Sequence, residues 1–123
     1  MRKVRKIMAL AAACAMIGTM SIVASAADTP YSVSSLTHKV TTVNDTSSTS
    51  TLHVNTRPST GYGGAHVEIR KSNGTFINSK DFPFYVSTTD LTASVPSGEA
   101  RRIYVGPVLS GQTVIGNLHY YFG

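Results

Sequence analysis

The 123-residue sequence contains no tryptophan and only one cysteine. That cysteine, Cys14, and all four methionines lie within residues 1–26, a segment that we expect to be removed. The remaining chain then has no cysteine, which excludes an internal disulfide and a cysteine nucleophile. Small secreted domains often depend on disulfides. This one must instead be stabilised by its core, by hydrogen bonds or by self-association.

Excess positive charge is also absent from most of the chain. Four of the 11 Lys and Arg residues lie at positions 2–6, so seven remain against six Asp and Glu residues. In residues 27–123 only Arg70-Lys71 and Arg101-Arg102 place two basic residues together. A nucleic-acid partner would require a larger basic cluster, so we expect none.

Residues 1–26 have the three parts of a secretory signal peptide. A basic start is followed by the uncharged segment 7–23 and by Ala24-Ser25-Ala26, the small residues that signal peptidase requires. We predict cleavage between Ala26 and Ala27 and a secreted, extracellular protein, either free or associated with the cell surface. The alternative is a retained transmembrane helix, for which this segment is at the short limit of about 17–25 residues.

Residues 27–123 are expected to form one domain, and they show no sustained helical repeat of apolar residues. Apolar and polar residues instead alternate in short runs, at 52–54, 65–70, 82–86, 91–95, 103–105 and 114–122. Such alternation is typical of half-buried strands. Segment 31–43 predicts a further strand with a break near Ser34-Ser35. The sequence therefore predicts an all-β fold, a small antiparallel β-sandwich or jelly-roll-like domain of about seven or eight short strands.

Turn residues separate these runs. Asn73-Gly74 is the strongest hairpin signal and predicts a type I′ turn with positive φ at both positions. Pro96-Ser97-Gly98 and Ser110-Gly111-Gln112 predict further turns, and 44–50 and 58–64 predict longer loops. The apolar positions of the strands predict a buried core made of Val67, Ile69, Phe82, Phe84, Leu91, Val95, Ile103, Val105 and Leu118.

The chain offers little evidence of catalysis. It contains no Gly-x-Ser-x-Gly motif, and its six carboxylates lie in no context that would raise a pKa. A domain of this size also has little volume for a deep cleft. We therefore expect no enzymatic activity and no cofactor.

Three histidines, His53, His66 and His119, are predicted to point outward from their strands. They could approach one another and bind a metal if those strands were neighbours. A tetrahedral site needs three or four convergent ligands, however, and no motif such as His-x-His supports one. Outward positions are also where a strand ordinarily holds histidine, so we expect no metal site.

Four tyrosines are the candidate ligand contacts. Tyr62 lies in a glycine-rich loop, and Tyr85, Tyr104 and Tyr121 are predicted to point away from the core. Exposed tyrosines stack on sugar rings or anchor protein interfaces, although they also serve cross-strand packing. The absence of tryptophan, the stronger sugar-stacking residue, weakens the case for carbohydrate binding.

Together these features favour a secreted, non-enzymatic extracellular module, of bacterial type, that acts by surface binding or matrix-type interaction. Its partner would be an extracellular protein or glycan. The alternative is a secreted effector, such as a bacteriocin or a membrane-active β-toxin, and only this alternative involves membrane contact. Low net charge counts against it, because basic residues near anionic lipid each contribute about 1 kcal/mol.

Segment 113–122 contains no charged residue and no proline. These residues normally protect an exposed strand edge from pairing with another chain. At a sheet edge this strand would therefore favour a homo-oligomer that forms through the C-terminal strand. The alternative is a central strand, which needs no such protection.

Overall fold

The computed structural model describes residues 27–60 and 62–123, and the predicted signal peptide lies outside them. The described residues contain no helix, and hence none that could span a membrane. They form eight strands: β2 (Ala27–Val33), β3 (Thr37–Val43), β4 (Ser50–Thr56), β5 (Ala65–Lys71), β6 (Phe76–Phe82), β7 (Leu91–Val95), β8 (Ala100–Pro107) and β9 (Val114–Phe122).

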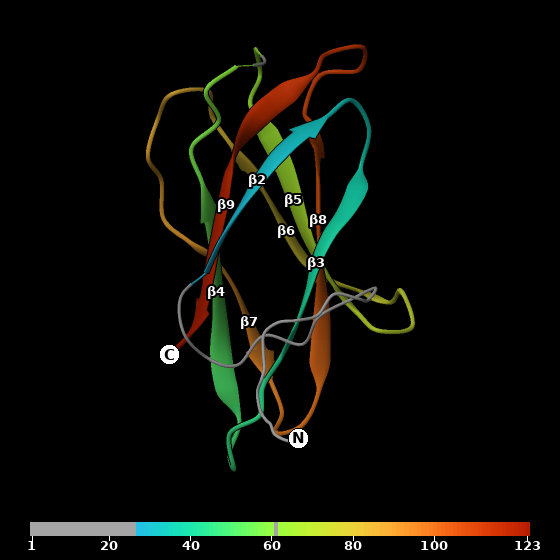
Figure 1. Cartoon of the computed structure of the whole chain (residues 1–123), viewed down its shortest axis with the longest axis vertical. Helices are drawn as coiled ribbons and strands as arrows, with labels where there is room; N and C mark the ends of the chain where they lie inside the picture. Colours follow the sequence, from blue (N-terminus) through green and yellow to red (C-terminus); the bar gives the residue numbers. More distant parts are fainter. Residues whose placement is uncertain (1–26, 61) are drawn as a thin grey trace, which may run out of the picture.

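The strands make two four-stranded antiparallel sheets, with the orders β2-β9-β4-β7 and β3-β8-β5-β6 (Figure 1). Along the chain the pairing is nested: β5 pairs with β6, β4 with β7, β3 with β8 and β2 with β9. The chain is therefore one long hairpin folded over itself into a sandwich. This is the arrangement of a jelly roll, and the predicted fold class is confirmed.

The centre of the nested pairing is the connection that Asn73-Gly74 marks. The predicted hairpin is present, but the predicted turn type is wrong. The Gly74 N–H donates to the Lys71 carbonyl (2.9 Å), and in this connection only Gly74 has a positive φ, of 91°. The Lys71 N–H donates in turn to the Thr75 carbonyl (2.8 Å). The connection is thus a type I turn followed by a left-handed glycine, a second common hairpin geometry.

The hydrophobic core lies between the two sheets. Eight of the nine predicted core residues are at most 3% exposed, and these are Val67, Ile69, Phe82, Leu91, Val95, Ile103, Val105 and Leu118. Tyr31 is also buried, and its hydroxyl forms a hydrogen bond with that of Thr56 (2.7 Å). The polar tip of this core residue is therefore satisfied.

Phe84 is the exception, because the predicted strand 82–86 does not exist. Strand β6 ends at Phe82, and Tyr85 has a left-handed backbone with φ 58°. Pro83 also lacks the N–H that a continuing strand would use. The chain turns away here, and Phe84 lies half-buried outside the core cluster.

The prediction of one strand over 31–43 is wrong, because this segment holds the end of β2 and the whole of β3, which are separated at residues 34–36 and lie in different sheets. Strand β9 lies between β2 and β4, so both of its edges are paired. The hypothesis of an exposed C-terminal edge is therefore wrong, and the central-strand alternative describes the molecule. Self-association through β9 would require β2 to leave the sheet.

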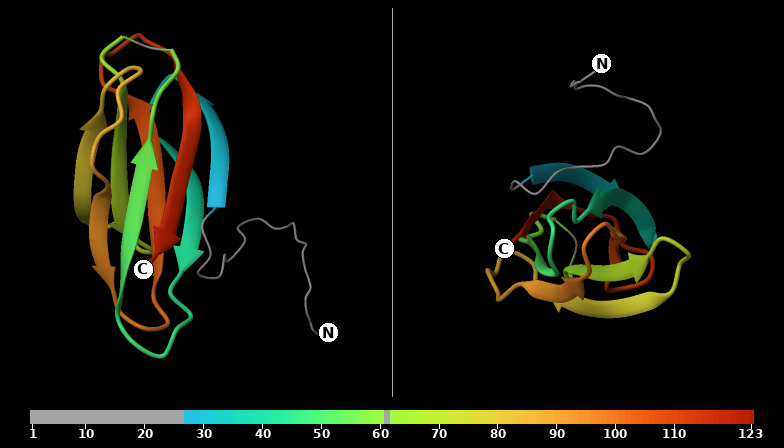
Figure 2. Two further views of the ribbon diagram at one scale, coloured as in Figure 1. Left: turned by 90° about the vertical axis from the view of Figure 1, so that its left-hand side faces the viewer. Right: turned by 90° about the horizontal axis from the view of Figure 1, so that it is seen from below.

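Antiparallel pairing places the connections alternately at two ends of the sandwich. The loop end consists of residues 34–36, 57–60 with 62–64, 83–90 and 108–113, and it is at the top of Figures 1 and 2 (left). The turn end consists of residues 44–49, 72–75 and 96–99. The predicted turns at Gly98 and Gly111 are confirmed, each closed by a backbone hydrogen bond.

Candidate functional site

The connections of the loop end are tied to one another by their backbones. Pro58 lies at the centre of this network and is buried. Its carbonyl accepts from the Tyr85 N–H (3.0 Å), while the neighbouring Ser59 N–H donates to the Ile115 carbonyl (2.8 Å). The Val108 N–H donates to the Gly64 carbonyl (3.1 Å). These bonds hold three of the four connections against one another.

Exposed apolar side chains gather at this end. Seven large hydrophobic residues of the described chain are exposed, and six of them lie in the loop end or directly beside it. The six are Tyr62 (75%), Tyr85 (60%), Val86 (51%), Leu109 (48%), Leu36 (41%) and Ile115 (41%). The seventh, Phe76, begins β6 beside the turn end. Scattered exposed hydrophobic residues are ordinary, whereas their concentration at one end of a domain is typical of an interaction site.

Phe84 supports the two most exposed tyrosines. Its ring centroid lies 4.5 Å from that of Tyr85 and 5.9 Å from that of Tyr62, both in tilted geometry. Such tilted contacts are favourable for aromatic rings. The residue assigned to the core is thus the base of an aromatic cluster at the loop end.

Tyr85 is also the one described non-glycine residue with a positive φ. A left-handed backbone costs an L-residue with a β-carbon roughly 1–2 kcal/mol. Such strain persists only where the surroundings enforce it, and it concentrates at functional sites. Here the bond from the Tyr85 N–H to Pro58 helps to enforce it.

The loop end carries little charge. Its four connections contain one basic residue, Arg57, which is exposed, and one acidic residue, Asp90. The carboxylate of Asp90 accepts hydrogen bonds from the Asn55 amide (2.6 Å) and the Tyr121 hydroxyl (3.2 Å), and it lies 3.2 Å from His53 Nδ1. The Asn55 bond makes the largest contribution to a lowered pKa of Asp90. The Asp90 carboxylate therefore interacts with side chains on the outer face of the sheet.

Tyr104 and Tyr121 lie away from the loop end, on the outer faces of different sheets. Tyr121 stacks on His53, with centroids 4.5 Å apart, and its pKa is raised by burial and by the nearby Asp90. The ring centroids of Tyr104 and His38 are 5.2 Å apart, and the Arg70 guanidinium carbon lies 5.3 Å from the Tyr104 centroid. The four predicted tyrosines therefore form no single site, and these two make cross-strand contacts.

The histidines do not converge either. His53 and His119 flank Tyr121 on one sheet, whereas His66 belongs to β5 in the other sheet. His66 instead contacts Asp81 (2.6 Å) and Glu68 (2.9 Å). In residues 27–60 and 62–123 no three His, Cys, Asp or Glu side chains are placed to hold one metal ion.

Most of the loop-end surface was not predicted from the sequence. Tyr62 and Tyr85 were identified, but Leu36, Val86 and Leu109 were not. The sequence signal that could have identified them is an apolar residue within a segment rich in Ser, Thr and Gly, because an apolar side chain in such a loop is not directed into the core. No protein-family model matches the chain, and no curated protein matches its sequence.

Proposed function

We propose that the protein is a secreted, non-enzymatic extracellular module that binds an extracellular protein or glycan through its loop end. The observation that carries this proposal is the group of six exposed apolar side chains at one end of the sandwich, where three of the four connections are bonded to one another. Loops on a rigid sandwich commonly carry recognition. Partly exposed aromatic residues with little charge are also the composition of interface centres.

The non-enzymatic part rests on the sequence, which offers neither a mature cysteine nor a Gly-x-Ser-x-Gly motif. Secretion rests on the signal peptide predicted over residues 1–26. Cleavage at Ala26 would release a protein that begins with β2, and N-terminal sequencing of secreted material tests this directly.

A second candidate function is that of a membrane-active effector. The loop end supports it as well, because aromatic and aliphatic tips beside a single arginine suit the interface of a bilayer. The two candidates differ in the target, which is a surface macromolecule in one case and lipid in the other.

The test uses labelled mature protein, washed cells of the source organism, and dye-loaded vesicles of phosphatidylglycerol and phosphatidylcholine. Tyr62→Ser and Tyr85→Asn each remove an exposed aromatic ring, and asparagine tolerates the left-handed backbone at position 85. Phe76→Ser is the matched control, because it removes an exposed ring (53%) at the other end.

We expect saturable binding to cells that both tyrosine variants weaken about tenfold or more, as is typical when a central aromatic contact is lost. The Phe76→Ser variant should bind like the parent. Leakage of the vesicles that depends on the same tyrosines would instead establish the effector function. Equal behaviour of all three variants would exclude the loop end as the binding surface.

A further inference from the structure

The basic pairs Arg70-Lys71 and Arg101-Arg102 meet at the turn end. In the register of β5 with β8, Arg70 lies opposite Arg102 and Lys71 lies opposite Arg101. Like charges directly across an antiparallel pair are destabilising. Four cations placed in this way therefore require compensation.

On the outer face of the sheet, the positive charge of Arg70 is balanced by a carboxylate. Its Nε and Nη2 donate to Glu68 Oε1 (2.8 and 2.6 Å), and its guanidinium lies over the Tyr104 ring. Its neighbour Lys71 is different, since in the described part of the chain its ammonium forms no ion pair.

Arg101 points to the interior, and its side chain is only 4% exposed. Its Nη1 makes both of its hydrogen bonds, to Glu99 Oε1 (2.9 Å) and to the Ala100 carbonyl (2.8 Å). Its Nε is the one buried side-chain nitrogen or oxygen of the described residues without a hydrogen-bond partner. An unsatisfied buried donor is unfavourable, especially on a charged group.

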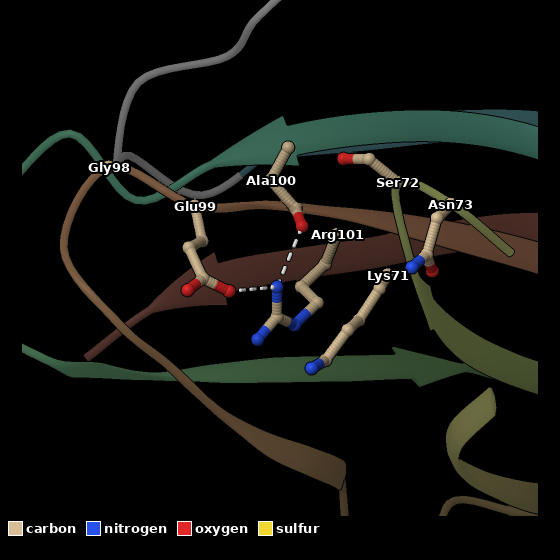
Figure 3. Close-up of a pocket in the computed structure, with 7 residues that line it drawn as sticks. All are labelled: Lys71, Ser72, Asn73, Gly98, Glu99, Ala100 and Arg101. Atoms are coloured by element: carbon tan, nitrogen blue, oxygen red, sulfur yellow. Dashed lines mark hydrogen bonds and ion pairs between the residues drawn. The ribbon is translucent and has the colours of Figure 1, made fainter. Parts of the chain in front are cut away.

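Arg101 is also one of the residues that line a pocket of about 420 Å³. In Figure 3 the side chains of Lys71 and Arg101 extend into the same region, and the Arg101 Nη1 contacts Glu99. The backbone of Glu99, which lines the pocket, is fixed because its carbonyl accepts a hydrogen bond from the Asn44 N–H (3.0 Å). The lining residues are Lys71, Ser72, Asn73, Gly98, Glu99, Ala100 and Arg101.

We propose that this pocket binds an oxyanion group (phosphate, sulfate or carboxylate) carried by a small polar molecule. The Arg101 guanidinium would donate to one oxygen and the Lys71 ammonium to another, which would place an anion between two facing cations. The Asn73 Oδ1 already accepts from the Thr75 N–H (2.9 Å), so its amide N–H groups remain for the ligand. The volume is within the range of small-molecule sites.

The charge of the lining favours an anion, since it contains two cations and one carboxylate. That carboxylate, on Glu99, is itself 49% exposed. The site lies at the opposite end from the aromatic cluster, so it neither depends on the proposed function nor tests it.

The experiment is a titration of the mature protein with sodium phosphate, followed by amide NMR and matched with sodium chloride to constant ionic strength. Saturable shifts should appear at residues 71–74 and 98–101 and should be absent with chloride. Parallel titrations with sulfate and acetate identify whether a tetrahedral or a planar oxyanion binds more tightly.

Lys71→Gln is the informative variant because Lys71 is exposed and its loss leaves the core intact. It should weaken phosphate binding about tenfold, the effect of losing one charge-assisted hydrogen bond. Arg57→Gln is the control, since it removes the same charge from an exposed side chain at the loop end. The absence of saturable shifts, or equal weakening in both variants, would overturn the proposal.

Discussion

Two phenylalanines that are only two positions apart, Phe82 and Phe84, have very different surroundings. Phe82 is fully buried in the core, whereas Phe84 is half-buried beneath two tyrosines. We expect Phe82→Ala to lower the free energy of unfolding by about 3–5 kcal/mol. Phe84→Ala should lower the free energy of unfolding by only about 1 kcal/mol, because the half-buried Phe84 side chain removes less apolar area from water when the chain folds.

Urea unfolding followed by far-ultraviolet circular dichroism measures both values, since the chain has no tryptophan to report on unfolding. Equal losses for the two variants would mean that Phe84 belongs to the core after all. The comparison is also a control for the binding experiments, because it shows whether a change in the aromatic cluster lowers the stability of the fold.

His66 gives the molecule a pH dependence. Burial lowers the pKa of His66, but hydrogen bonds to Asp81 and Glu68 and their charges outweigh this and raise it above its ordinary 6.5. Burial raises the pKa of Glu68, yet hydrogen bonds from His66 and Arg70, with their charges, bring it below its ordinary 4.5. The two shifts support one interaction, between a protonated imidazole and an ionised carboxylate.

The stabilisation by His66 is fully present below pH 6.5 and is lost as the pH rises through its raised pKa. That by Glu68 is present above pH 4.5 and is lost as the pH falls through its lowered pKa. We therefore expect the interaction of His66 with Glu68 to stabilise the fold most between pH 4.5 and pH 6.5. His66→Gln should abolish the decrease above pH 6.5 in denaturant midpoints measured across pH. A decrease that persists unchanged in this variant would assign it to other groups.

At the scale of elements, two left-handed glycines differ in what surrounds them. Gly74, with φ 91°, has open space where a β-carbon would be placed. At Gly64, with φ 85°, a β-carbon would overlap the Phe82 carbonyl oxygen. This backbone cannot yield easily, because Gly64 is fixed by its bond to the Val108 N–H.

We expect Gly74→Ala to cost about 1–2 kcal/mol, the penalty of the left-handed backbone alone. Gly64→Ala should cost about 3 kcal/mol or more, because the steric overlap adds to that penalty. Each variant is the other's control in a thermal unfolding experiment. A Gly64→Ala protein as stable as Gly74→Ala would show that the loop end rearranges readily.

The strands with clear alternation were predictable because one face of each enters the core. Strand β6 was predicted only in part. It is an edge strand with polar residues on both faces, and the apolar residues after Phe82 imitate a continuing strand. The type I′ turn was a wrong prediction because Asn-Gly is compatible with more than one hairpin geometry.

The two candidate sites depend on contacts that local sequence does not encode. Leu36, Val86 and Leu109 come to the same end of the sandwich as Tyr62 only after the strands have paired. The burial of Arg101 was equally hidden, since arginine is rarely buried and nothing near Ala100 signals it. Its position opposite Lys71 is a consequence of strand register, which turns and distant pairings determine together.

At the scale of the whole molecule, the edges of the two sheets carry features that oppose pairing with another chain. The edge strands are β2 and β7 in one sheet and β3 and β6 in the other. Pro30 in β2, Lys39 in β3 and Lys80 in β6 are residues that protect edges. Strand β7 is only five residues long, and the Asn78 amide occupies its Thr92 carbonyl. The unprotected strand β9 is held between β2 and β4.

Strand β2 therefore has two roles, since it supplies Tyr31 and Val33 to the core and covers an edge that is prone to association. We expect the mature chain to be monomeric in light scattering over a wide concentration range. A chain that begins at Ser34 should associate, because the exposed edge of β9 carries no charge and no proline.

Circular dichroism establishes whether the shortened chain keeps its β-structure, and a peptide of residues 27–33 supplies the missing strand in trans. An excess of this peptide should return the shortened chain to a monomeric complex, since it restores the pairing of β9 and fills the cavity left by Tyr31. A peptide with Tyr31→Ser should do so less well, because it pairs but cannot fill the core. Association of the intact mature chain would identify another surface, of which the apolar loop end is the first to examine, and the tyrosine variants would show whether it is responsible.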